Sequence, residues 1–325
     1  TAEGVAVILA DMDGMEGYRE LRESAAWLEL SGRGKIRMSG EDRVRLLHAM
    51  TTNHIENLKP GEGCYAFFLN AQGRILGDVC VFAMEDHLLL DTEPETREKL
   101  MAHLEKYIIA DDVTLEDATA GVATIGVEGP RASELLTALG APLPEAAYSH
   151  RAWRDRIVAR VDATGAGGFR LFAPVAAKES LVCGLEAAGA MQAGEEAARV
   201  VRLENGRPRY GEDITERHLP QETQQMHAVH FNKGCYLGQE IVERVRSRGH
   251  VNWLLVHLVL DLPEAPAAGA KLFYEGREAG EITTAAFSPA LGRVVALAYV
   301  RAEYAAKPVT GYAIPGIGFG PGKSG

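Results

Sequence analysis

Short apolar runs and helical patterns alternate through the first two thirds of the chain. Three apolar runs separated by turn residues predict consecutive antiparallel strands at 65–70, 76–84 and 87–92. The capping-box pattern Ser39-Gly40-Glu41-Asp42 predicts a helix before these strands, and Thr92-Glu93-Pro94-Glu95 starts another after them. The expected order over this stretch is therefore α-β-β-β-α.

A second group of elements has the same character. Strands are expected at 113–116, 122–127, 156–162 and 168–172, and helices at 130–139, 174–188 and 194–205. Two or three strands per helix are typical of an α+β fold and not of alternating parallel units. From Trp253 onward the pattern predicts only strands, which indicates a small β-barrel or sandwich.

Composition and charge exclude some classes of protein. The chain has 325 residues, 46% of them hydrophobic, which is enough for two or three domains. The net charge of −11 argues against a nucleic-acid-binding protein, and no apolar run reaches the ~20 residues of a membrane span. The N-terminal stretch 1–11 fits neither a secretory signal nor a transit peptide. We expect a cytoplasmic protein, and the lack of heptads favours a monomer.

The four cysteines do not form a metal-binding pattern. They are scattered with no C-x-x-C pair, which is unlike a zinc or iron–sulfur site. Cys64, Cys80 and Cys183 lie among apolar residues, and we expect each to be a small buried hydrophobe.

The fourth cysteine lies in the segment Lys233–Glu240, with the sequence KGCYLGQE. Thiolate is the reactive form of cysteine, and a nearby ammonium such as that of Lys233 lowers a thiol pKa from its free value of roughly 8.5. Gly234 and Gly238 give the backbone freedom to turn or to approach a ligand. Cys235 is therefore a candidate reactive thiol, and the alternative is a structural cysteine in a glycine-containing turn.

This octapeptide, including Tyr236, Gln239 and Glu240, resembles the signature of the YgfZ family of folate-binding proteins. That family is a branch of the aminomethyltransferase (glycine-cleavage T-protein) superfamily. Other segments resemble the superfamily in the expected order: 51–53, 68–75, Thr164-Gly165 with Gly168-Phe169, 202–206 with Tyr210-Gly211, and 287–292.

The resemblance implies a three-domain cloverleaf, with two ferredoxin-like α+β lobes and a C-terminal β-barrel around a central folate pocket. The expected bounds are 1–35 with 117–225 for the first lobe, 36–116 for the second, 226–250 for the signature segment and 251–325 for the barrel.

The implied function is binding of tetrahydrofolate, or a one-carbon derivative of it, in support of iron–sulfur cluster assembly or repair in client proteins. Cys235 and Lys233 would carry the thiol chemistry. Two alternatives stay open: a folate-dependent aminomethyltransferase or demethylase, and a non-catalytic folate carrier or sensor in which Cys235 is structural.

Several side chains are candidates for the folate site. Glu204 lies among Val200, Val201 and Leu203 near the end of an expected helix, so its carboxylate needs donors. The resemblance implies that this glutamate accepts the paired N–H edge of the pterin; the alternative is a salt bridge with Arg202 or Arg207. Further candidate folate-binding residues are Tyr65, Asp78 and Asp91.

One position departs from the T-protein pattern. Aminomethyltransferases carry an Asp-Asp pair where this chain has Gly77-Asp78. On this alignment Gly77 stands where the catalytic acid would be, and glycine has no side chain to move a proton. We therefore expect folate binding without T-protein chemistry.

A basic row follows the octapeptide. Arg244, Arg246, Arg248 and His250 alternate, and an extended backbone would place all four on one face. Such a row would suit a polyanion, for example the glutamate tail of folate. The alternative is a solvated strand edge protected by charge.

Overall fold

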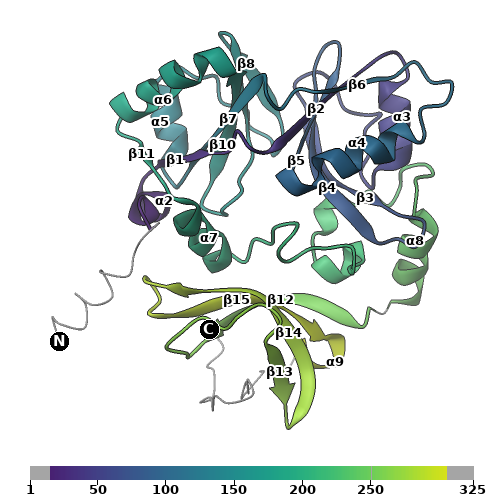
Figure 1. Ribbon diagram of the computed structural model, residues 1–325, viewed down its shortest axis with the longest axis vertical. Coiled ribbons are helices and arrows are strands. Elements are labelled where there is room, and N and C mark those ends of the chain that lie inside the picture. The colour runs from purple at the N-terminus through teal and green to yellow at the C-terminus, as the bar shows by residue number, and fades with distance from the viewer. Residues whose placement is uncertain (1–14, 250, 306–325) are drawn as a thin grey trace.

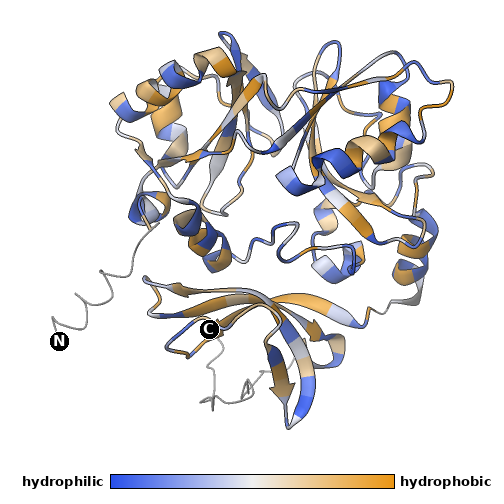
Figure 2. Cartoon of the chain, in the orientation of Figure 1, coloured by the Kyte–Doolittle hydropathy of each residue, from blue (hydrophilic) through white to orange (hydrophobic). Residues whose placement is uncertain are grey.

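The computed structural model describes residues 15–249 and 251–305. The N-terminal stretch 1–11, His250 of the basic row and the end of the expected C-terminal domain lie outside the described residues. Figure 1 shows two α+β units side by side, with a third, β-rich unit beneath them. Hydrophobic residues are concentrated in the strands of all three units, whereas the helices are mixed (Figure 2).

The first unit, called here the first lobe, has a six-stranded sheet in the order β11-β1-β7-β10-β9-β8. Its strands are β1 (Ala26–Glu29), β7 (Val122–Glu128), β8 (His150–Trp153), β9 (Arg156–Ala159), β10 (Gly168–Pro174) and β11 (Met191–Gln192). Its helices are α2 (Tyr18–Glu23), α5 (Ala132–Ala138), α6 (Lys178–Ala187) and α7 (Glu195–Glu204).

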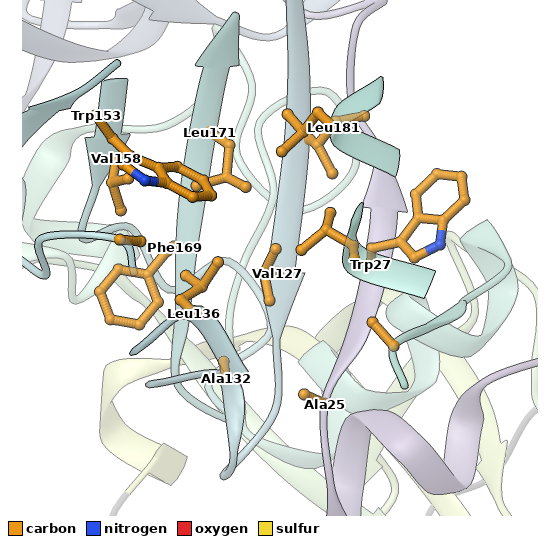
Figure 3. Close-up of a cluster of buried hydrophobic side chains, with 14 of the residues drawn as sticks. Ala25, Trp27, Val127, Ala132, Leu136, Trp153, Val158, Phe169, Leu171 and Leu181 are labelled. Carbon is orange, nitrogen blue, oxygen red and sulfur yellow. The ribbon is translucent and has the colours of Figure 1, made fainter. Parts of the chain in front are cut away.

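The two faces of this sheet have different partners. On one face Trp27, Val127 and Phe169 pack with Leu136 of α5 and Leu181 of α6 (Figure 3). The opposite face, which is called the inner face below, is covered by α2 and α7 at one end and meets the second lobe at the other.

The second lobe is built on a five-stranded sheet in the order β3-β4-β5-β2-β6. Its elements are β2 (Gly34–Ser39), α3 (Arg43–Met50), β3 (Gly63–Leu69), β4 (Ile75–Ala83), β5 (Leu88–Thr92), a 3₁₀ turn (Pro94–Thr96), α4 (Arg97–Glu105) and β6 (Thr114–Asp117). The antiparallel pairs β3–β4 and β4–β5 confirm the strand order expected from sequence.

The C-terminal unit is a four-stranded antiparallel sheet in the order β12-β15-β14-β13. The strands are β12 (Trp253–Leu260), β13 (Lys271–Tyr274), β14 (Arg277–Ser288) and β15 (Arg293–Arg301), and the short α9 (Ala302–Ala305) follows. The expected C-terminal β-barrel is present as a barrel-like sheet that does not close within the described residues, because the outer strands β12 and β13 do not pair with each other there. The four strands curve as an open sheet (Figure 1).

The basic row lies on a helix, which corrects the extended row expected from sequence. Two 3₁₀ turns, Pro220–Thr223 and Met226–Ala228, lead to α8 (Gln239–Arg248). Residues two apart on an α-helix differ by about 200°, so Arg244 and Arg246 do not share a face. The sequence favours a helix here because Glu240 and Arg244 form an i,i+4 ion pair at 2.7 Å.

A further correction concerns Cys183, which is exposed, while Cys80 is buried as expected. Cys183 lies on α6, whose Leu181 and Leu185 face the core instead.

The two glycines that flank α8, Gly238 and Gly249, differ in the space around them, and this difference explains why the octapeptide contains a glycine at position 238. Both have left-handed backbones, with φ of 84° at Gly238 and 73° at Gly249. An added Cβ at Gly238 would lie 2.7 Å from the Asn70 carbonyl oxygen, while one at Gly249 would meet nothing within 4 Å. Gly238→Ala is expected to lower the free energy of unfolding by about 3 kcal/mol and Gly249→Ala by about 1 kcal/mol.

Chemical denaturation of both variants measures this difference. Equal losses at the two positions would contradict the close packing of α8 against the β3–β4 turn.

Candidate functional site

The face of the second sheet that meets the first lobe carries a row of polar side chains. The strand register pairs Tyr65 with Cys80, Cys80 with Asp91, and Asp91 with Lys35. Because side chains two apart along a strand share a face, Asp78 lies on the same face as Cys80. Cys80 and its neighbour Phe82 pack against Ala159 and Phe172 of the first lobe. The row therefore lies between the two lobes.

This register changes the meaning of the Gly77-Asp78 pair. Gly77 faces the other side of the sheet, where an added Cβ would lie 3.1 Å from the Leu100 side chain on α4. An acid at position 77 would point into the apolar core of the second lobe. The residue that faces the lobe junction is Asp78, so the presence of Gly77 does not remove an acid from that junction.

Asp78 is a buried carboxylate with one oxygen in use. The Tyr65 hydroxyl donates to its Oδ2 at 2.8 Å. Its Oδ1 is buried and has no hydrogen-bond partner among the described residues. Burial, together with the nearby charge of Glu93, raises the pKa of Asp78 to about 6, against the opposing effect of Arg33. Such a group can accept an N–H or exchange a proton near neutral pH.

Asp91 is the centre of an ion cluster that joins the lobes. Its carboxylate is fully buried and binds Arg170 of β10 and, at 2.8 Å, Arg33 of the connection before β2. Arg33 also pairs with Glu93. The Nε of Arg170 is buried without a partner among the described residues, so this guanidinium keeps one donor available.

Aromatic rings lie beside Asp78. The ring of Tyr65 is nearly parallel to that of His227, with centroids 5.3 Å apart, and to that of Tyr148 at 6.1 Å. Tyr148 has a left-handed backbone with φ of 61°, a strained conformation that is enriched at functional sites.

Glu204 lies at a separate position, between the first lobe and the C-terminal sheet. Its carboxylate accepts hydrogen bonds from Tyr18 of α2 and Ser288 of β14 and pairs with Arg22 at 3.1 Å. The expected alternative partner Arg202 instead pairs with Glu212 and Asp213. Glu204 borders a pocket of about 270 Å³, which is lined by Arg22, Pro130, Ala166, Val201, Glu204, Asn205 and Leu291.

In the octapeptide, the side chain of Lys233 is bound to main-chain oxygens. Its Nζ donates to the carbonyls of His48, Thr51 and Asn53, at 2.5 to 2.8 Å, at and just beyond the C-terminal end of α3. Burial lowers the pKa of Lys233 to about 7. Cys235 is exposed. The geometry thus gives Lys233 an anchoring contact in the second lobe.

The other residues of the motif have structural contacts. The backbone of Gly234 passes next to His48, and the buried ring of Tyr236 lies under the Lys233 ammonium at 4.9 Å. Gln239 and Glu240 begin α8. Arg246 stacks on Phe231 and borders a second pocket of about 250 Å³, while Arg244 pairs with Glu240.

The structure brings Tyr65, Asp78 and Asp91 together and leaves Glu204 and Cys235 at separate places. Sequence reasoning missed Arg170 and Arg33. The sequence does contain a sign that Arg170 is buried and paired: it interrupts the apolar run of Phe169, Leu171 and Phe172. A charge in such a strand needs a buried partner. Arg33 lies in a connection and has no comparable signal.

Comparison with known proteins decides the family. The family model described as GCVT N-terminal domain matches residues 14–233, and that described as glycine cleavage T-protein C-terminal barrel domain matches 254–315. This chain belongs to the glycine cleavage T-protein (aminomethyltransferase) family. An aminomethyltransferase of Rubrobacter xylanophilus is 31% identical over 88% of this chain and 78% of its own length.

Other members of the T-protein family agree. An aminomethyltransferase of Thermus thermophilus is 31% identical over 93% of this chain and 87% of its own. The crystal structure of the glycine cleavage system aminomethyltransferase T from Bartonella henselae has the same fold, with a TM-score of 0.86 at 22% identity, covering 95% of this chain and 87% of that one.

Membrane-spanning helices and metal-binding clusters are both absent from the described residues. None of the helices there has the length and apolar character to cross a membrane, and no group of three or more His, Cys, Asp or Glu side chains there is arranged to hold a metal ion.

The contacts of Lys233 generate a prediction. Lys233→Met is expected to lower the free energy of unfolding by about 2 to 3 kcal/mol, because three carbonyls lose their donor. The rate at which iodoacetamide alkylates Cys235 in the folded variant is expected to change less than about twofold, since the charge is bound to carbonyls. Lys59→Met, at an exposed lysine, is the control.

Mass-spectrometric mapping of alkylation and denaturation curves give both quantities. A tenfold slower alkylation of Cys235 with unchanged stability would instead support Lys233 as the group that activates the thiol.

Proposed function

We propose that this T-protein family member binds tetrahydrofolate, or a one-carbon derivative, at the junction of the lobes, in the centre of the cloverleaf that the resemblance implies. The observation that carries the proposal is the buried Oδ1 of Asp78, which has no hydrogen-bond partner among the described residues and lies beside an aromatic cluster. The names of the relatives support it, because those proteins are aminomethyltransferases.

The side chains at the junction fit a reduced pterin. Its ring system has N–H donors that match Asp78 Oδ1 and a carbonyl acceptor that matches the unused Nε donor of Arg170. Tyr65, Tyr148 and His227 provide flat surfaces of the kind on which rings pack. Tetrahydrofolate, when bound, supplies a ring nitrogen that accepts a one-carbon unit.

Two further groups lie apart from the lobe junction, and we propose each as a separate folate contact. Glu204 borders the 270 Å³ pocket at the end of α7, and we keep it as a second folate contact. Arg246 borders the second pocket, and we propose that it binds the glutamate tail of folate. Arg244 lies two residues earlier on α8, about half a helical turn away.

Asp78→Asn is expected to weaken binding of 5-formyltetrahydrofolate about tenfold, which is the ~1.4 kcal/mol expected for a lost charge-assisted hydrogen bond. Below pH 6 the wild type should weaken in the same way, because Asp78, with its pKa raised to about 6, is then protonated. Isothermal titration calorimetry between pH 5 and 8 measures both effects.

Asp86→Asn, at an exposed aspartate paired with Arg37, is the control and should leave binding unchanged. Glu204→Gln tests the second contact separately. A dissociation constant that is unchanged in Asp78→Asn would remove Asp78 from the ligand, and binding lost only in Glu204→Gln would move the pterin to the 270 Å³ pocket.

We further propose a YgfZ-type role, in which the folate-bound protein supports assembly or repair of iron–sulfur clusters in clients through Cys235. The support is the exposed thiol of the third residue of the KGCYLGQE segment, on a turn held by Lys233 and Gly238. An exposed thiol is accessible to a partner, as such a role requires.

In cells that lack their own factor of this type, the Cys235→Ala variant is expected not to restore the activity of iron–sulfur enzymes. Cys183→Ala is the matched control, because Cys183 is also exposed but lies on α6 of the first lobe. Full rescue by Cys235→Ala would favour the non-catalytic folate carrier or sensor.

A second candidate function is folate-dependent aminomethyl transfer or demethylation, and the placement of Asp78 favours it. Asp78 faces the lobe junction, whereas Gly77 faces α4. Incubation with tetrahydrofolate and an aminomethylated donor distinguishes the candidates. Methylenetetrahydrofolate formed by the wild type and not by Asp78→Asn would establish the transferase.

A further inference from the structure

Glu128 is a buried carboxylate that is not among the proposed folate contacts. It is the last residue of β7 and is fully buried. The register places it between Ala26 of β1 and Gly168 of β10. Glu128 and Arg170 belong to paired strands with the same alternation, so Glu128 lies on the inner face of the first sheet.

Every donor that Glu128 receives comes from one loop. The backbone N–H of Ala163 donates to Oε1 at 3.2 Å, and the backbone N–H of Thr164 to Oε2 at 3.2 Å. The Thr164 hydroxyl donates to Oε2 at 2.7 Å. An added Cβ at Gly168 would lie 2.6 Å from the carboxyl carbon, so the carboxylate occupies the space that a side chain at Gly168 would need.

This loop forms a wall of the 270 Å³ pocket. Ala166 lines the pocket, and so does Asn205, whose Nδ2 donates to the Thr164 carbonyl at 3.0 Å. Asp162 holds the same loop from the solvent side by accepting the N–H groups of Gly165 and Gly167 at 2.7 and 3.2 Å. A continuous set of hydrogen bonds therefore runs from Glu128 through Thr164 to Asn205.

We infer that Glu128 is a positioning residue for the 270 Å³ pocket: it fixes the 163–166 loop, and through Thr164 it fixes Asn205, in the arrangement that receives ligand. The inference rests on the proposed function, because it takes the 270 Å³ pocket as part of the folate site. Glu128 itself does not line that pocket.

The charge state of Glu128 provides a spectroscopic readout. Burial raises the pKa of Glu128 to about 7, and Asp162, the nearby like charge, adds to this effect; Asp162 itself pairs with Arg207 at 3.4 Å. Each carboxyl oxygen of Glu128 accepts a backbone N–H, so a proton added to either oxygen would point toward that N–H. Protonation therefore disturbs the loop contacts, and ionisation restores them.

The experiment compares the full-length wild type with Glu128→Gln, and with Glu222→Gln as control. Glu222 is also buried, with a raised pKa, and accepts the Leu219 N–H at 2.8 Å away from this pocket. Affinity for 5-formyltetrahydrofolate is expected to fall about fivefold in Glu128→Gln and to be unchanged in Glu222→Gln. By NMR, the amide protons of Ala163 and Thr164 should titrate near pH 7 in the wild type and not in Glu128→Gln.

Unchanged affinity in a folded Glu128→Gln variant, or amide shifts that titrate in it as in the wild type, would overturn the inference. If that variant does not fold, Asp162→Asn loosens the same loop from the exposed side and must lower the affinity for the inference to stand. Absence of binding by the wild type would refute the proposed function, while the amide titration would still report whether Glu128 holds the loop.

Discussion

The relative placement of the three units depends on one continuous chain of ion pairs. It runs from Arg170 in the first lobe to Asp91 in the second, then through Arg33, Glu93, Arg209, Glu212 and Arg202 to Asp213. Asp213 is fully buried and accepts hydrogen bonds from Thr283 and Thr284 of the C-terminal sheet, both at 2.6 Å. Removing one partner of a buried pair typically costs about 3 to 5 kcal/mol, whereas the intact pair adds little net stability. This series of ion pairs therefore fixes the relative positions of the three units more than it adds to the free energy of unfolding.

The candidate site follows from this geometry. Because Arg170 and Arg33 hold Asp91 from both sides, the polar face of the second sheet is fixed against the first lobe. Asp78 lies on that face, where burial raises its pKa while Arg33 and Arg170 oppose the rise. The network thus keeps a carboxylate poised near neutral pH, and one of its oxygens has no hydrogen-bond partner in the part of the chain that the structure describes. Folate binding and any proton transfer would use that oxygen.

Local patterns predicted much of the fold, and long-range pairings set the rest. The strands β3, β4 and β5 were predictable because turn residues separate apolar runs. The alternating arginines of α8 suggest an extended row, although the i,i+4 charges there favour a helix. The closeness of Lys233 to Cys235 in sequence suggests an activated thiol, but the partners of Lys233 are carbonyls some 180 residues away in sequence, and no local pattern shows them. Tyr65, Asp78 and Asp91 are candidates for the folate site from sequence, and the strand register gives the physical reason why these three lie together.

A crystal structure of the complex with 5-formyltetrahydrofolate tests the account most directly. We predict the pterin between the lobes, with one of its N–H groups at about 2.9 Å from Asp78 Oδ1, the usual hydrogen-bond length. The ion pairs of Arg170 and Arg33 with Asp91 should be intact in that complex. A pterin bound elsewhere, with Asp78 Oδ1 still buried and unpartnered, would contradict the account.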